Sequence, residues 1–350
     1  MTRPANLTAS RLALHVTFAL LVAIALGTTI PLIGGQINLK TAIATAPWAD
    51  YPTTDAMVFW GTRIPRVLLA LLVGGALAVA GLAFQAVLRN PLAEPYVLGI
   101  SSGASLGKML AALAGLQAAA TAPYLSPVLC FAGSLLPLTV LQVMAARTRR
   151  FSAVSLLLAG VMLNVIITSF MLLLQFFADF TRVQQMYVWA LGGLDIVGYG
   201  QLAVVAPIVA VAGIVLFFQT RAMNLLSLDP ATAAHLGLDV SRAVQRIMLA
   251  AAVLTSAVVA VSGPIGFVGL VVPHALRLMF GADNRLLLPL SLIWGGVFLL
   301  ACDFLGWRGL ELLAAAGAPI RQTSEIPVGI ITALIGGPVF MVLLLRSARR

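Results

Sequence analysis

The sequence predicts an all-α, polytopic transmembrane protein with about ten membrane-spanning helices. Of its 350 residues, 61% are hydrophobic and only 9% are charged, a balance that excludes an ordinary soluble domain. Apolar stretches of bilayer-spanning length recur from Leu12 to Leu345. A hydrocarbon core about 30 Å thick needs roughly 20 helical residues, because lipid offers backbone groups no hydrogen-bond partners.

These apolar stretches define ten candidate spans, which together make the whole chain (1–350) a single transmembrane domain. In order, they are Leu12–Ile33, Ile64–Leu88, Tyr96–Gly115, Tyr124–Ala145, Val154–Phe177, Gln201–Gln219, Val244–Ser262, Pro264–Phe280, Leu286–Leu305 and Ile326–Leu345. The first lacks a polar cleavage region and precedes nine more spans, so we expect a retained helix rather than a signal peptide. The eighth is short and opens with glycines and a proline, which predicts a broken or re-entrant segment.

The distribution of charge predicts the orientation of these spans. An even number of spans puts both termini on one side, which we expect to be cytoplasmic. That side then carries 14 basic residues (Arg3, Arg11, Arg89, Arg147, Arg149, Arg150, Arg221, Arg242, Arg246, Arg277, Arg285, Arg346, Arg349 and Arg350) and four acidic ones (Glu94, Asp229, Asp239 and Asp283). Their difference equals the whole net charge of +10. Positive loops stay in the cytoplasm, so the charge needs no nucleic acid partner.

Residues that could support catalysis or metal binding are absent from the sequence pattern. Cys130 and Cys302 both fall inside apolar spans, so neither indicates a disulfide framework or a paired metal site. The three histidines, at positions 15, 235 and 274, are too far apart to show a metal-ligand spacing. No nucleophile–base arrangement is evident. We therefore expect no catalytic residue, no metal site and no cofactor on this chain.

The third span contains glycines spaced for close helix packing. Gly99, Gly103 and Gly107 recur every four residues, which lets helices approach closely in lipid. The pair Gly107-Lys108 resembles the end of a phosphate-binding loop. That loop needs glycine at position 102 and serine or threonine at 109, where this chain has serine and methionine. We therefore expect no nucleotide site here.

Charged residues near the middle of the predicted membrane are almost absent. Lys108 and Asp303 are the nearest exceptions, and the sequence shows no partner for either. Proton- and sodium-coupled carriers usually place ionisable residues near mid-membrane. The energy for any transport is therefore expected to come from elsewhere.

Polar residues form a stripe on the fifth span. Asn164, Thr168, Met171 and Gln175 stand at i, i+4, i+7 and i+11, which places them on one helical face. Polar groups at membrane depth need a partner on another helix or a wet cavity. Two interpretations stay open: hydrogen bonding between helices, or the lining of a translocation path.

The segment 223–240, between the sixth and seventh spans, predicts a short helix at the cytoplasmic face. Asp229 suits the N-cap, Pro230 the first helical position and Gly237 the C-terminal stop, which gives a helix of about Pro230–Leu236. Small residues would let another protein approach it closely; they are Ala231, Ala233 and Ala234. A solvated surface helix is the alternative, but it does not explain the leucines at 225, 226 and 228 in a preceding loop.

The chain resembles one family over nearly its whole length, and three segments carry the resemblance most clearly. They are RIPRVLLALLVGGALAVAGLAFQAVLRNPLAEPYVLGISSGASLG (63–107), SGPIGFVGLVVPHALRL (262–278) and EIPVGIITALIGGPVF (325–340). They are similar to the permease subunits of ABC importers for iron–siderophore, haem and cobalamin complexes, the FecCD type. The resemblance implies a type II importer permease fold in the bacterial inner membrane. It also implies a homodimer with its path at the subunit interface, two cytoplasmic ATPases that hold ATP and magnesium, and a periplasmic binding protein.

The resemblance also implies roles for individual residues at the cytoplasmic side. Asn90 and Leu92 match a cytoplasmic gate, and the loop of Ser152, Ala153 and Val154 is similar in position to a second gate, although its small polar residues are partly replaced. The 229–240 segment resembles the coupling helix that docks on the ATPase, with Asp229, Pro230, Ala233, Ala234 and Gly237 as its characteristic residues.

At the outer side, the resemblance implies arginines that pair with acidic residues on the binding protein. Arg63 and Arg66 match two of them. A third is expected between Asp303 and Glu325, where Arg308 and Arg321 both qualify. These two acidic residues are 22 positions apart, about ten more than the family usually has, so this loop carries an insertion.

Together these features predict the permease subunit of an ATP-driven importer of a metal chelate. Ferric siderophore is the first expectation for the ligand, followed by haem and corrinoids. An ion-coupled secondary carrier is the alternative, which the missing mid-membrane ionisable pairs disfavour. An intramembrane enzyme would need a catalytic dyad or metal site, and the sequence shows neither.

Overall fold

The computed structural model of the protein describes residues 9–33, 38, 41–42, 53–115, 125–147, 153–194, 198–228, 230–315 and 325–348, and in these ranges its regular structure is entirely helical. Ten helices correspond to the expected spans: α1 (Ala9–Thr29), α4 (Ile64–Leu88), α5 (Ile100–Leu113), α6 (Leu125–Arg147), α7 (Ala153–Phe177), α9 (Gly200–Phe218), α12 (Val240–Ser262), α13 (Val268–Phe280), α14 (Asn284–Ala315) and α15 (Val328–Ala348). Seven of the described helices are long and apolar enough to cross a membrane. The predicted all-α transmembrane fold is confirmed.

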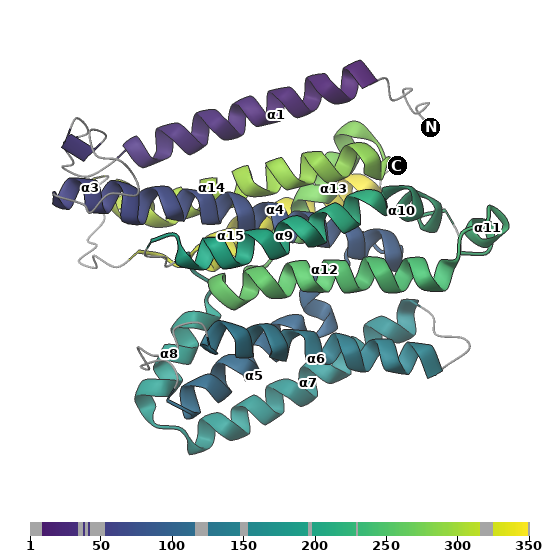
Figure 1. Ribbon diagram of the computed structural model, residues 1–350, viewed down its shortest axis with the longest axis horizontal. Helices are drawn as coiled ribbons and strands as arrows, with labels where there is room; N and C mark the ends of the chain where they lie inside the picture. The colour runs from purple at the N-terminus through teal and green to yellow at the C-terminus, as the bar shows by residue number, and fades with distance from the viewer. Residues whose placement is uncertain are drawn as a thin grey trace.

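Shorter helices lie at the two ends of this bundle (Figure 1). At one end are α3 (Thr54–Val58) and α8 (Phe180–Ala190), and at the other are α10 (Thr220–Leu226) and α11 (Pro230–His235). We call these the outer and inner ends, after the predicted topology. Helices α5, α6 and α7 form one side of the bundle, and α1 lies along the opposite side.

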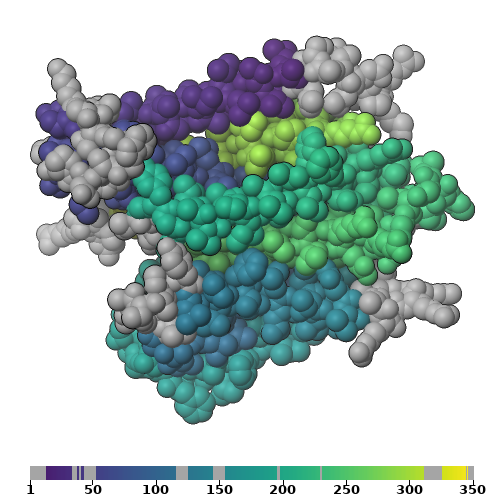
Figure 2. Space-filling view, viewed as in Figure 1, coloured from purple at the N-terminus to yellow at the C-terminus, as the bar shows by residue number. Residues whose placement is uncertain are grey.

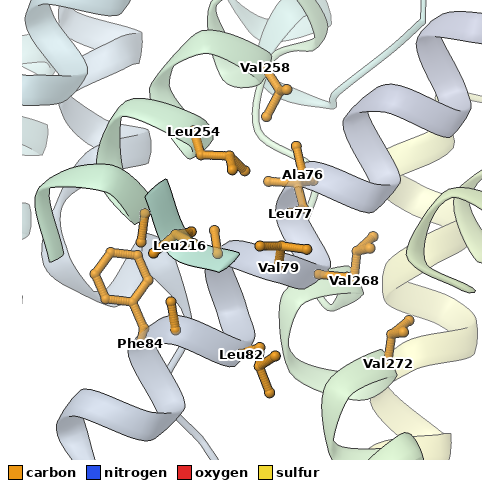
Figure 3. Close-up of a cluster of buried hydrophobic side chains, with 14 of the residues drawn as sticks. Ala76, Leu77, Val79, Leu82, Phe84, Leu216, Leu254, Val258, Val268 and Val272 are labelled. Carbon is orange, nitrogen blue, oxygen red and sulfur yellow. The ribbon is translucent and has the colours of Figure 1, made fainter. Parts of the chain in front are cut away.

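Helix α4 forms the centre of the core. It packs against α12, α13 and α14, and the cluster in Figure 3 joins its Leu77 and Leu82 to Leu254 of α12 and Val268 of α13. Glycines make this packing possible, because a Cβ on Gly81 would overlap the backbone carbonyl group of Gly269.

The predicted glycine contacts of the third span are also present. Gly103 and Gly107 of α5 lie directly against the backbone of α6 at Gly133 and Leu129, where a Cβ would not fit. This confirms their packing role. It also places Gly107-Lys108 inside a regular helix, a geometry unlike that of a phosphate-binding loop.

The eighth predicted span is broken, as its sequence suggested. Helix α12 ends at Ser262, and a non-helical linker, 263–267, precedes the 13-residue helix α13. Phe267, the last linker residue, has φ +70°, a left-handed conformation that is strained for a bulky side chain.

Two helices extend beyond their predicted spans at the outer end. Helix α4 continues a helical segment that begins at Thr54 and passes through one π-helical turn, Phe59–Arg63. Helix α14 runs on to Ala315, so the first part of the inserted segment is helical. The chain returns to α14 at Ile326, whose N–H donates to the Gly306 carbonyl oxygen at 3.2 Å.

Candidate functional site: gates, docking surfaces and a polar path

At the outer end, Arg66 of α4 binds two carboxylates, one on α14 and one on the residues that lead into α15. Its Nε and Nη2 donate to Oδ2 and Oδ1 of Asp303, each at 2.9 Å, and its Nη1 donates to Oε2 of Glu325 at 2.6 Å. The Arg66 and Asp303 side chains are 18% and 9% exposed. The sequence showed no partner for Asp303, and the structure corrects this. Arg66, which is expected to dock the binding protein, also binds two carboxylates of its own chain, and its docking role stays a prediction.

Two of the other predicted outer arginines, Arg63 and Arg308, lie against one indole ring. The guanidinium carbons of Arg63 and Arg308 each lie 5.1 Å from the centre of the Trp307 ring. Arg63 Nη1 also donates to the Pro31 carbonyl oxygen at 2.9 Å. A cation over an indole face is stabilised by the ring quadrupole, so Trp307 can hold two like charges together. Arg321 lies outside the described residues.

The first predicted gate lies in the turn that follows α4. Arg89 ends the helix in a left-handed conformation, with φ 49°. The Asn90 side chain then accepts a hydrogen bond from the Leu92 N–H at 2.9 Å, which shapes the turn and leaves Leu92 exposed. The Asn90 side chain therefore stabilises this turn, and the Leu92 side chain is exposed on its surface.

The second predicted gate is described only in part. Ser152 lies outside the described residues, and Ala153 is the first residue of α7. Val154 is exposed at the inner end of that helix. The gate role of these residues stays a prediction.

Glu94 and Tyr96, to which the sequence analysis gave no role in the site, connect the gate turn to the linker 263–267. Oε1 of Glu94 accepts a hydrogen bond from the Phe267 N–H at 2.7 Å. The Tyr96 hydroxyl donates to the Ile265 carbonyl oxygen and accepts from the Ile265 N–H, both at 3.0 Å. Burial raises the pKa of the Glu94 carboxyl above its ordinary value, and the hydrogen bond from Phe267 opposes that shift. In the sequence, these two residues could have been identified as a carboxylate and a phenol that flank Pro95 between two apolar spans.

Helix α11 has the predicted short form and C-terminal stop. The Gly237 N–H donates to the Ala234 carbonyl oxygen at 2.9 Å, and the Leu238 N–H donates to that of Ala233 at 3.0 Å. With φ +83° at Gly237, this is a Schellman motif. Pro230 is the first helical residue, as predicted, and Asp229 lies outside the described residues.

The two alanines proposed for docking differ in exposure. Ala234 is exposed, whereas Ala233 is fully buried and faces the protein. Leu228 and Leu236 flank the short helix and are both exposed. Only the Ala234 face of α11 is therefore available to another protein.

The segment before α11 is a helix rather than the predicted loop. Leu225 and Leu226 belong to α10, and Leu226 is buried in the core. Asn224 fixes this helix to the start of α14, because its Nδ2 donates to Oδ1 of Asp283 at 2.7 Å and its Oδ1 accepts from the Asn284 N–H at 2.8 Å. These hydrogen bonds connect α10 to the start of α14 at the inner end.

The polar stripe lies along the flank of α7. Asn164, Thr168, Met171 and Gln175 are all half-buried, between the packing face of the helix and its exposed apolar face. Among the described residues, no hydrogen-bond partner is found for the Asn164, Thr168 and Gln175 side chains. The interpretation as helix–helix hydrogen bonding within this chain therefore has no support in the described structure.

Lys108 has neutral neighbours. Its Nζ donates to the Ser126 hydroxyl oxygen at 3.2 Å and lies 6.0 Å from the centre of the Trp189 ring.

Among the described residues, no group of three or more His, Cys, Asp or Glu residues is placed to hold a metal ion.

Comparison with known proteins decides the family. Residues 16–346 match the FecCD transport family. The chain belongs to the FecCD family. This FecCD permease is 40% identical over 299 residues to the hemin transport system permease protein HmuU of Yersinia pestis, covering 84% of this chain and 86% of HmuU. It is 36% identical over 305 residues to the vitamin B12 import system permease protein BtuC of Vibrio cholerae, covering 86% and 87%.

The fold of this FecCD permease agrees with a solved structure. An ABC transporter of the metal-chelate type in an inward-facing conformation aligns with a TM-score of 0.79 and 26% identity, covering 95% of this chain and 98% of that one. An uncharacterized ABC transporter permease protein of Bacillus subtilis, YvrB, is 38% identical over 294 residues, covering 83% of this chain and 80% of YvrB. The relatives are transport permeases, which agrees with a transport subunit.

Proposed function

We propose that this permease moves a chelated metal or corrinoid across the inner membrane, driven by a separate ATPase and supplied by a periplasmic binding protein. The observation that carries the proposal is α11, a capped helix at the inner end with one exposed face of small side chains. It stands within a chain whose family and relatives are permeases of haem and vitamin B12 import. ATP and magnesium belong to the partner ATPase in this proposal.

Two copies of the chain would form the transport unit, with α7 facing the path between them. Half-buried polar side chains without a hydrogen-bond partner in the described structure need water or a second copy at membrane depth. The stripe of α7 supplies such side chains. Asn90, Leu92 and the 152–154 loop would close the cytoplasmic end of this path, and both termini would be cytoplasmic.

At the outer end, Arg63 and Arg308 are the arginines that we propose for docking acidic residues of the binding protein. Trp307 holds both guanidinium groups at one place, where two positive charges favour an acidic partner. Arg66, whose guanidinium group binds two carboxylates of its own chain, stays a prediction for this role.

Reconstitution tests the proposed function. The purified permease is placed in proteoliposomes with its ATPase and binding protein, and uptake of ferric siderophore, haemin and cobalamin is measured. We expect ATP-dependent uptake of one of these ligand classes and none without the ATPase. Uptake that follows a proton or sodium gradient in the absence of the ATPase would show the secondary-carrier alternative to be correct.

A further inference from the structure

Between α9 and α12, the described residues form a groove lined by apolar side chains and one cationic side chain. Its volume is about 510 Å³. Eight apolar residues line it, and the ninth lining residue is Arg246; the apolar residues are Pro207, Ile208, Val211, Ala212, Val215, Leu249, Ala250 and Val253. The two helices lie side by side on the face shown in Figures 1 and 2.

Arg246 stands at the inner end of this groove. It is six residues after the start of α12, and Leu249 and Val253 follow it toward the outer end at spacings of three and four. The remaining groove therefore extends about two helical turns, or roughly 10 Å, from Arg246 into the predicted membrane. A long side chain in this position lays its methylene groups along the apolar wall and keeps its charge at the membrane interface.

The charge of Arg246 is not balanced within the described structure. Arg246 is exposed and forms no ion pair with the described residues. The nearest acidic residue in sequence, Asp239, is already engaged by Arg242, with an Oδ2–Nε distance of 3.1 Å. An anionic group at the level of Arg246 would supply the missing counter-charge.

We propose that this groove binds an anionic phospholipid, with an acyl chain between α9 and α12 and the phosphate beside Arg246. A phospholipid is the ligand that matches both features, because its chain is apolar and its charge lies at the interface. Basic pockets between transmembrane helices on the cytoplasmic side are suited to such headgroups. No residue of α7 lines the groove, so the groove is separate from the polar stripe.

The test uses the full-length permease, stripped of lipid in detergent and titrated with phosphatidylglycerol or phosphatidylcholine. Native mass spectrometry measures the fraction that carries one lipid. We expect the wild-type protein to prefer phosphatidylglycerol and R246Q to bind it about five-fold more weakly, in keeping with roughly 1 kcal/mol for each basic residue at a lipid surface. R246K keeps the charge and should restore most of the preference.

Two further variants distinguish lipid binding in the groove from lipid attraction by the general surface charge. R242Q removes a charge one turn away, on a side chain that is 74% exposed and already paired, and it should leave the preference unchanged. L249W narrows the groove at an exposed position without changing the charge, and it should weaken binding of both lipids.

Equal binding of the two lipids by the wild-type protein would overturn the proposal, as would equal losses in R242Q and R246Q. A cross-link between L249C side chains of two copies would also overturn it, because the occupant would then be a second subunit.

Discussion

Arg66 and Asp303 are 237 positions apart in sequence, yet they form a two-bond ion pair at the outer end of the bundle, with both N–O distances at 2.9 Å. Glu325 completes the cluster from the residues that lead into α15. The start of α4, the outer half of α14 and the entry to α15 are therefore fixed relative to one another. Because the pair is largely buried, the loss of either partner leaves a charge in a poorly solvated place.

Removal of the Arg66 charge is expected to destabilise the permease. R66M should lower the free energy of unfolding by about 3–5 kcal/mol, because Asp303 loses its bidentate partner. The double variant R66M/D303L removes both charges and should recover much of the loss. Thermal unfolding in detergent measures this, and R182M is the control, since Arg182 pairs with Asp179 on the surface and should contribute no more than about 1 kcal/mol. A similar loss in R66M and R182M would contradict the structural role.

Coupling to the ATPase is expected to depend on the exposed face of α11. A234R should abolish co-purification of the ATPase and ATP-driven uptake, while the permease still folds, because Ala234 makes no buried contact that the arginine would disturb. A190R places the same side chain at an exposed position in α8, at the opposite end of the molecule, and should leave both properties unchanged. If A234R still couples normally, the assignment of α11 is wrong. Ala233 is unsuitable for this test because it is buried.

The stripe on α7 is expected to contact water in at least one transport state. Single cysteines at Asn164, Thr168 and Gln175 should react with a water-soluble thiol reagent in the reconstituted transporter. Cysteines at Leu163 and Leu172 should not, because those positions lie off the polar stripe. The native Cys130 and Cys302 are both buried and should contribute little background. Uniform protection of all five positions would favour a purely structural role for the stripe.

Docking of the binding protein is expected to depend on the arginines at Trp307. R63E/R308E should slow association of the loaded binding protein, while ATPase assembly persists. Association of the wild-type permease should itself slow as salt is added, because charges at an interface rim act mainly on the encounter rate. Surface plasmon resonance with the permease in nanodiscs measures both effects. R182E, which changes another outer-end arginine, is the control. If R182E slows association as much as R63E/R308E does, Arg63 and Arg308 are not a specific docking site.

The contact between Tyr96 and the linker is expected to stabilise the broken eighth span. Y96F removes the hydroxyl that pairs with both the N–H and the carbonyl oxygen of Ile265, which should cost about 1–3 kcal/mol because these backbone groups are left without partners. Thermal unfolding measures the loss. Tyr187 is exposed on α8, and Y187F should have little effect. If uptake by Y96F also slows at temperatures where the variant is fully folded, the turn at Arg89–Leu92 and α13 move together.

The sequence by itself determined the class of the protein, because lipid offers backbone groups no hydrogen-bond partners and long apolar stretches therefore cross a bilayer as helices. It also determined local features whose causes lie within a few residues, such as the Gly237 stop of α11 and the close packing at Gly103. The break in the eighth span was predictable for the same reason, since glycine and proline act on the neighbouring backbone.

Only the tertiary structure decided which side chains meet. Arg63 and Arg66 are three positions apart and gave the same signal in sequence, yet one lies against Trp307 and the other binds Asp303 and Glu325. Ala233 and Ala234 are adjacent, and only the second is exposed. These differences arise from contacts between segments that are far apart in the chain, and no local pattern records which partner a long side chain reaches after the helices have packed.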